Sequence, residues 1–173
     1  MKYWTSGFGW SLLIAFLLIF IVMLQAAVTA YRTVPEDQAQ QAFNQMMAER
    51  EKLTATDIFI NNLRSTWTLI VPIIGIIPFI VVMHNTGWII GELSLVYNIY
   101  PSIVLQNLMV IGFTEILAYT IMLGENIYFS ASTLTGGTSQ AIDRTPHFIL
   151  STILYVILLF IGAVIEIMVI SGA

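Results

Sequence analysis

Residues 61–92 read NNLRSTWTLIVPIIGIIPFIVVMHNTGWIIGE, and the rest of the chain is organised around this stretch. It is apolar enough to cross a lipid bilayer, because a membrane-spanning helix needs about 20 mainly apolar residues. It also contains asparagines, an arginine, two prolines, a histidine and a glutamate, which a simple membrane anchor does not need. Burying such groups in hydrocarbon costs free energy. We therefore interpret the surrounding region, residues 57–126, as the working part of the protein.

The composition of the whole chain is typical of an integral membrane protein. Of its 173 residues, 58% are hydrophobic and 9% are charged, against roughly 45–50% and about 25% in a soluble domain. Residues 1–173 are therefore predicted to form one multi-pass domain in a cell membrane, in contact with the lipid bilayer. The net charge of −4, with only six Lys and Arg, argues against a nucleic-acid partner. Cysteine is absent, which excludes disulfides, thiolate metal sites and Cys nucleophiles.

The predicted fold is all-α: a polytopic transmembrane bundle of about five membrane helices, plus one extramembrane amphipathic helix. Residues 11–30 are interpreted as the first span. A cleavable signal peptide is the alternative, but the apolar run is longer than the usual ~7–15-residue core of such peptides. Residues 33–56 are the only sizeable polar segment. With Thr33 as N-cap and Pro35 behind it, they predict an amphipathic helix that packs on the protein's own surface or offers a face to a partner.

The second span is expected over residues 58–83, after a Thr-x-x-Asp capping box at residues 54–57. Pro72 and Pro78, with Gly75 between them, leave backbone groups unpaired and predict a kink or break. In lipid, a break survives only where neighbouring helices or water satisfy the freed groups. This span is therefore expected inside the bundle.

The remaining segments are predicted from their glycines, prolines and lengths. Residues 88–100, which contain Gly91, are short for a crossing, because about 13 helical residues rise only ~20 Å against a ~30 Å hydrocarbon core. They are interpreted as a tilted span or a re-entrant half-helix. The other predicted segments are a tight turn at residues 84–87 ending at Gly87, an interrupted span at residues 103–123 that could continue to residue 134, a flexible loop at residues 135–140, and a last span at residues 147–170 capped by Thr145 and Pro146.

Several short motifs follow one another in residues 57–126. They are Ile58-Phe59-Ile60-Asn61-Asn62-Leu63-Arg64, then Gly75 with Pro78, then Asn85-Thr86-Gly87 with Gly91, and then Gly112 to Glu115. In this order and spacing the region resembles the stage II sporulation protein M-like family of integral membrane proteins. It departs from the family pattern at residues 85–87, where the turn would read Asn-Gly, and at residues 110–111, where Pro-His would be expected.

The resemblance implies a small polytopic membrane protein. In spore-forming lineages it implies a membrane subunit that organises partner cell-wall hydrolases. Other members of the family are partly similar to permease components of transporters.

Seven polar side chains are candidates for an intramembrane polar core: Asn61, Asn62, Arg64, Asn85, Glu92, Asn107 and Glu115. A charged carboxylate at mid-bilayer costs at least ~2.5–3.5 kcal/mol, so Glu115 should face the bundle interior, be protonated or be paired. We expect a contact of Glu115 with Arg64, or with Asn62, that fixes the helix register. A substrate- or proton-linked role for Glu115 is the alternative. The candidate break or turn positions are Pro72, Gly75, Pro78, Gly87 and Gly91.

The sequence contains no pattern typical of an active site. No nucleophile motif or phosphate-binding glycine loop is present, and the two histidines, His84 and His147, are far apart in the sequence. We therefore predict no catalytic residue, no cofactor and no metal. The first hypothesis is a non-enzymatic subunit that scaffolds a larger membrane complex, with other membrane subunits or further copies of itself as partners. The second is a permease-type component that moves a solute or lipid, and the third is an accessory subunit of an energy-converting complex.

Overall fold

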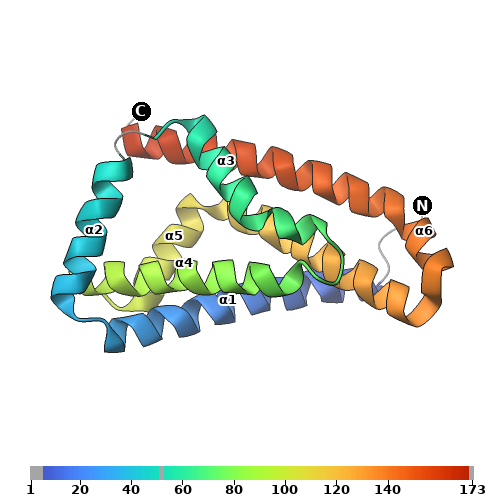
Figure 1. Cartoon of the computed structure of the whole chain (residues 1–173), viewed down its shortest axis with the longest axis horizontal. Helices are drawn as coiled ribbons and strands as arrows, with labels where there is room; N and C mark the ends of the chain where they lie inside the picture. The colour runs from blue at the N-terminus through green and yellow to red at the C-terminus, as the bar shows by residue number, and fades with distance from the viewer. Residues whose placement is uncertain (1–5, 51–52, 172–173) are drawn as a thin grey trace.

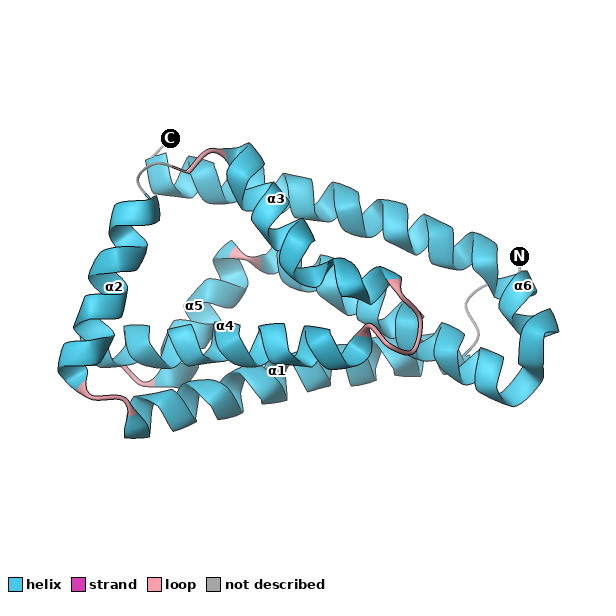
Figure 2. Cartoon of the chain, in the orientation of Figure 1, coloured by secondary structure: helices cyan, strands magenta, loops and turns pink. Residues whose placement is uncertain are grey.

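The computed structural model describes residues 6–50 and 53–171 of the chain. Every regular element within these ranges is helical, which confirms the prediction of an all-α protein (Figures 1 and 2). The elements are α1 (Ser6–Thr33), α2 (Glu36–Arg50), α3 (Ala55–Thr66), the 3-10 helix η1 (Trp67–Ile70), α4 (Ile76–Val96), α5 (Pro101–Ile111) and α6 (Phe113–Ser171).

Three of these helices, α1, α4 and α6, are long and apolar enough to cross a membrane within the described residues. In α6 the chain turns back at Gly137, which has φ 69° and ψ −163°, so α6 forms two limbs (Figure 1). The limbs pack on each other, because the rings of Phe129 and Phe148 are in contact, with their centres 5.0 Å apart. The loop predicted at residues 135–140 therefore contains the point where the chain reverses. It is shorter than predicted, because helix continues almost to Gly137 on both sides. Pro146 lies inside the second limb and does not cap a new helix.

The turn predicted at residues 84–87 is wrong, because these residues lie inside α4. Buried Gly87 and Gly91 instead face α1, where a Cβ on either residue would collide with α1 backbone at Met23 or Ala27. Small residues four apart on one helix face allow two membrane helices to approach closely. The predicted short element at residues 88–100 is likewise the second half of α4, which ends at Val96.

The break predicted around Pro72 and Gly75 is confirmed: α3 gives way to η1, and helix resumes only at Ile76. The single span predicted over residues 58–83 is wrong, because the chain reverses at this break and α3 and α4 run in opposite directions (Figure 1). Residues 71–75 are called the unwound segment below. Gly75 permits it, because a Cβ there would collide with the carbonyl oxygens of Thr68 and Val71. Pro78 lies in the first turn of α4, where a missing N–H breaks no helical hydrogen bond.

Helix α2 lies across the ends of α1 and α4 (Figure 1). It packs on α4 through Ala39, which is fully buried, and through an edge contact of Phe43 with Tyr97. The predicted cap at Thr33 is wrong, because Thr33 is the last residue of α1 and its hydroxyl donates to the Thr29 carbonyl. Residues 51 and 52 of the predicted amphipathic segment lie outside the described residues.

The predicted capping box is confirmed at the start of α3. The Thr54 hydroxyl accepts a hydrogen bond from the Asp57 N–H at 3.2 Å, and the Asp57 carboxylate accepts one from the Thr54 N–H at 2.9 Å. The predicted span at residues 103–123 is divided, because α5 ends at Ile111 and α6 begins at Phe113. Gly112 stands between them and places Glu115 in the first turn of α6.

Candidate functional site

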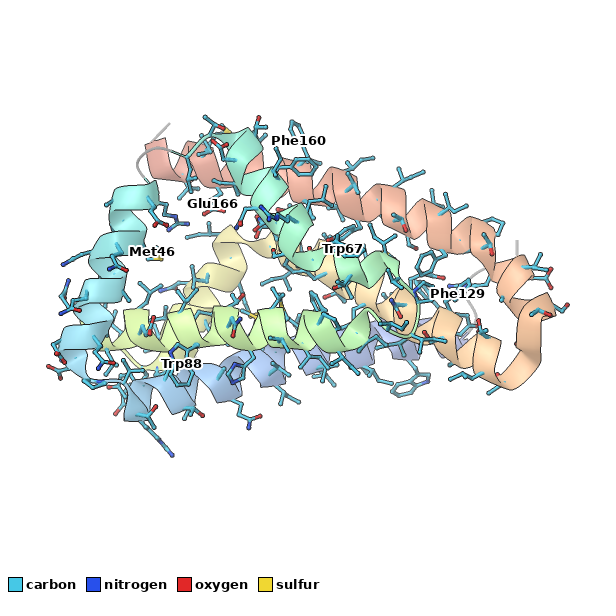
Figure 3. The ribbon with its side chains drawn as sticks, viewed as in Figure 1. Met46, Trp67, Trp88, Phe129, Phe160 and Glu166 are labelled. Carbon is cyan, nitrogen blue, oxygen red and sulfur yellow. The ribbon has the colours of Figure 1, made fainter. Side chains whose placement is uncertain are left out.

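A cavity of about 480 Å³ lies between α3, α4, α5 and the two limbs of α6, and the last residue of α2 reaches its edge. We call it the Glu115 cavity. Figure 3 shows Glu166, one of its charged residues, on the last turns of α6 near α3. The polar residues that line it are Arg50, Asn61, Asn62, Ser65, Asn85, Thr86, Glu115 and Glu166. It therefore has a polar part inside an otherwise apolar helical bundle.

Glu115 is held in the cavity wall by contacts on two sides. The Asn62 side-chain amide donates a hydrogen bond to Glu115 Oε1 at 2.8 Å. On the other side, Glu115 packs against the second limb of α6 at Gly162, where a Cβ would lie 2.6 Å from Glu115 Cγ. The absence of a side chain at residue 162 thus makes room for the carboxylate, which is half-buried.

A second carboxylate, Glu166, lines the cavity close to the first. Glu166 follows Gly162 by four residues, and residues four apart lie on the same face of a helix. It forms an ion pair with Arg50, whose side chain is 36% exposed against 22% for Glu166. The cavity wall thus contains two carboxylates and one guanidinium, and the guanidinium is engaged with Glu166.

A pair of buried hydroxyl groups lies behind the cavity lining, next to Tyr119. Thr66, which is fully buried, donates to the Asn62 carbonyl at 2.5 Å and hydrogen-bonds the Tyr155 hydroxyl. Tyr119 lines the cavity beside them and packs its ring on Phe79 at 5.6 Å. Asn62 and Thr66 of α3 thus have hydrogen-bond partners on both limbs of α6: Glu115 on the first limb and Tyr155 on the second.

The structure brings four of the seven predicted polar residues to this cavity. Asn62 and Glu115 are in contact, which confirms one of the two contacts expected for Glu115. Asn61 and Asn85 line the cavity from exposed positions on α3 and α4, so they lie at its rim. The predicted contact of Glu115 with Arg64 is wrong. Residues 62 and 64 point about 200° apart on a helix, and Arg64 is exposed.

The other two predicted residues lie elsewhere. Glu92 accepts a hydrogen bond from the Trp88 indole N–H at 3.1 Å and lines a separate cavity of about 300 Å³ between α2 and α4. Asn107 is exposed on α5 and lines neither cavity. The expectation that both belong to the polar core is therefore wrong.

Sequence reasoning missed Asn126, which holds the unwound segment. Asn126 is fully buried on α6. Its amide nitrogen donates to the carbonyls of Leu69 at 2.8 Å and Val71 at 2.9 Å. Its amide oxygen accepts from the Ile73 N–H at 3.1 Å, and Ser130 accepts from the same N–H at 2.9 Å. A helix break inside a membrane requires such partners from a neighbouring helix. In the sequence, only the prolines indicated that partners of this kind were needed.

A second missed group is the buried ion pair of Glu125 with Arg144, which joins the two limbs of α6. The guanidinium donates two hydrogen bonds of 2.7 Å to the two carboxylate oxygens, and Glu125 is 1% exposed. Arg144 also lies over the rings of Phe8 and Tyr128, at 5.0 and 4.4 Å from their centres. Because its charges are fully paired, we interpret this group as structural.

Comparison with known proteins gives no relative: no protein-family model, no curated protein and no solved structure matches the chain. Within residues 6–50 and 53–171, no group of three or more His, Asp or Glu side chains is placed to hold a metal ion.

Proposed function

We propose that the protein is a multi-pass integral membrane protein whose Glu115 cavity binds a small solute, and that it works as a permease-type component. The observation that carries the proposal is a cavity of about 480 Å³ with a half-buried carboxylate held on a neutral amide. Small-molecule sites in proteins have volumes of roughly 300–1,000 Å³ and combine apolar walls with a few placed polar groups. A charged group inside a membrane bundle is costly, which favours a functional reason for its presence.

The proposal includes five passes through the membrane. In Figure 1, α1 and α4 run in one direction, and the chain returns between them through α3 and η1. The first limb of α6 then runs back, and the second limb reverses once more. Each limb exceeds the about 20 residues that a crossing needs. The proposed passes are α1, residues 58–75, α4, residues 101–136 and residues 138–171, with α2 on the membrane surface.

One of these passes is interrupted at Gly112, and the unwound segment lies where two other passes meet. Interrupted helices beside intramembrane polar groups are typical of substrate sites in transporters. The interruption at Gly112 directly precedes the turn that carries Glu115. A single copy of this chain encloses little space, so the proposal has it act as an oligomer or together with partner chains.

The scaffolding role and the role in an energy-converting complex stay predictions from the sequence. Neither gives the Glu115 cavity a use. The resemblance to the stage II sporulation protein M-like family also stays a proposal. It agrees with a permease-type component, because family members outside spore formers are partly similar to such components. Native-membrane crosslinking that recovers a stoichiometric partner would support the scaffolding role.

The proposal is tested by ligand-induced stabilisation of the full chain in lipid nanodiscs. A ligand that binds only the folded state raises the unfolding temperature. We would measure that temperature with panels of small ammonium compounds, carboxylates and neutral polar compounds. We expect one class to raise it in the wild type and in Glu92→Gln, because Glu92 lies outside the cavity, but not in Ser65→Phe, which places a ring in the cavity. Stabilisation by none of the classes would refute the proposal.

A further inference from the structure

We infer that the Glu115 cavity selects an organic cation: one ammonium group attached to an apolar body. This inference rests on the proposed function of the cavity as a solute site. It adds the chemical class of the solute and names Glu115 as the counter-charge. Three properties of the cavity carry it: its charge balance, its free acceptors and its apolar walls.

The charge balance of the cavity favours a single positive charge. Among the described residues that line it, the charged ones are Arg50, Glu115 and Glu166. Arg50 is paired with Glu166. Glu115 accepts a hydrogen bond from the neutral amide of Asn62, and neither ion pair among the described residues includes it. The N-terminal end of α6 offers at most about half a positive charge, so one carboxylate stays undercompensated.

An anionic solute fits this site poorly. It would face two carboxylates, and the one guanidinium among the described lining residues is already engaged with Glu166. A cation that reaches Glu115 instead meets an attraction that is several times stronger than in water, because the surroundings have a low dielectric constant. A metal ion held by several His, Asp or Glu side chains is also disfavoured, since no group of three of them is placed for one among the described residues.

Hydrogen-bond acceptors are placed where an ammonium group needs them. An ammonium group has three N–H donors and no acceptor. Asn62 occupies Glu115 Oε1, and the described residues donate no hydrogen bond to Oε2. The side-chain carbonyls of Asn61 and Asn85 at the rim supply further acceptors. The polar part of the cavity thus matches a donor-rich cation.

The rest of the wall matches an apolar body. It is formed by aliphatic side chains, the ring of Tyr119 and three methionines, which are Met23, Met83 and Met109. Methionine side chains are flexible and adapt to ligands of different shape. An aromatic face also attracts a nearby cation. A fully polar cation would leave these walls without a partner, so the inferred ligand is amphipathic.

The experiment compares three compounds of similar shape that differ in charge: 2-phenylethylammonium, 2-phenylethanol and 3-phenylpropanoate. Binding to the full chain in nanodiscs is measured by titration calorimetry and by the shift in unfolding temperature. We expect 2-phenylethylammonium to bind at least about tenfold more tightly than the other two, since a charge-assisted contact contributes more than 1.4 kcal/mol. Glu115→Gln should remove that preference, Glu115→Asp should retain it in part, and Glu92→Gln should leave it unchanged.

Each outcome has one meaning. Equal or tighter binding of the alcohol or the carboxylate by the wild type would overturn the inference, while the cavity would remain a solute site. Binding of none of the three, with none from the wider panels, would refute the proposed function itself. The comparison of the three compounds needs only the wild-type chain, so the inference is tested even if Glu115→Gln does not fold.

Discussion

The substitution Asn126→Ala is expected to be among the most damaging single changes in this protein. The side chain is fully buried and bonds three backbone groups of residues 69–73. Alanine removes all three hydrogen bonds without adding bulk. Ser130 still accepts from the Ile73 N–H, so that group keeps a partner. The Val71 carbonyl also keeps a partner, because it accepts a hydrogen bond from the Gly75 N–H at 3.0 Å. The carbonyl of Leu69, a fully buried residue, loses its hydrogen bond from Asn126.

The magnitude follows mainly from the Leu69 carbonyl, and the loss of the other two hydrogen bonds of Asn126 adds to it. Leaving a buried acceptor unsatisfied costs about 1–3 kcal/mol. Hydrogen bonds between helices in membranes average about 0.6 kcal/mol, because the unfolded chain in lipid also finds partners. Combining the two ranges gives an expected loss of about 2–4 kcal/mol in the free energy of unfolding. The non-glycine residue Ile73 has φ 68°, a conformation that costs roughly 1–2 kcal/mol and needs such support.

The assay is reversible unfolding in mixed detergent micelles, followed by circular dichroism. Asn107→Ala is the matched control, because Asn107 is exposed on α5 and its change should fall within about 0.5 kcal/mol. Asn126→Asp should be at least as damaging as Asn126→Ala, since it retains an acceptor for the Ile73 N–H but buries a carboxylate whose second oxygen faces the two carbonyls. A stability of Asn126→Ala within about 0.5 kcal/mol of the wild type would refute the role assigned to this side chain.

Three further substitutions and one control, Gly9→Ala, test the fold, each by the same unfolding measurement. Gly91→Leu should destabilise the protein by more than about 2 kcal/mol, because it forces α1 and α4 apart. Gly9→Ala, with no atom within 4 Å of the added Cβ, should be neutral or stabilising by up to about 1 kcal/mol. Glu125→Gln should cost about 3–5 kcal/mol, because it leaves the Arg144 charge buried without a counter-charge. Thr54→Ala should cost about 1 kcal/mol through loss of the capping box. Wild-type stability of Gly91→Leu, Glu125→Gln or Thr54→Ala would contradict the corresponding contact.

Features governed by neighbouring residues could be predicted from the sequence. The capping box at residues 54–57 and the break near Pro72 follow from local backbone chemistry, and the structure has both. Gly87 does not form the predicted turn, because a missing Cβ serves two purposes. It permits a turn, and it also permits close helix contact, and the sequence of residues 84–87 alone does not separate these uses.

The candidate site depends on contacts between distant residues, which the sequence pattern does not specify. Asn62 and Glu115 are 53 positions apart in the sequence. Glu115 contacts Asn62 and not Arg64, because the face of α3 that carries Asn62 is the one that meets α6. The ion pair of Arg50 with Glu166 spans 116 positions and requires the reversal at Gly137. The polar residues within the apolar segments predicted that a polar core exists. Which residues belong to it depends on how α6 packs against the other helices.

The most direct test of a cation-selective Glu115 cavity is the reaction of a cysteine placed inside it with small charged thiol reagents. The natural chain has no cysteine, so a single Thr86→Cys variant reacts without background. Thr86 lines the cavity from α4 and is half-buried. Ile153→Cys, on an exposed apolar position of α6, is the lipid-facing control. The reagents are the ethylammonium and ethylsulfonate methanethiosulfonates, and the reaction rates are measured in nanodiscs.

We predict that Thr86→Cys reacts with the ammonium reagent at least about tenfold faster than with the sulfonate, after correction for their rates with a free thiol, as a favourable potential of a few kT at the cavity implies. Adding Glu115→Gln should reduce this ratio several-fold, and Ile153→Cys should react slowly with both reagents. Failure of both reagents to reach Thr86→Cys would contradict a solute site at the cavity. An equal or faster reaction with the sulfonate would contradict its selectivity for cations.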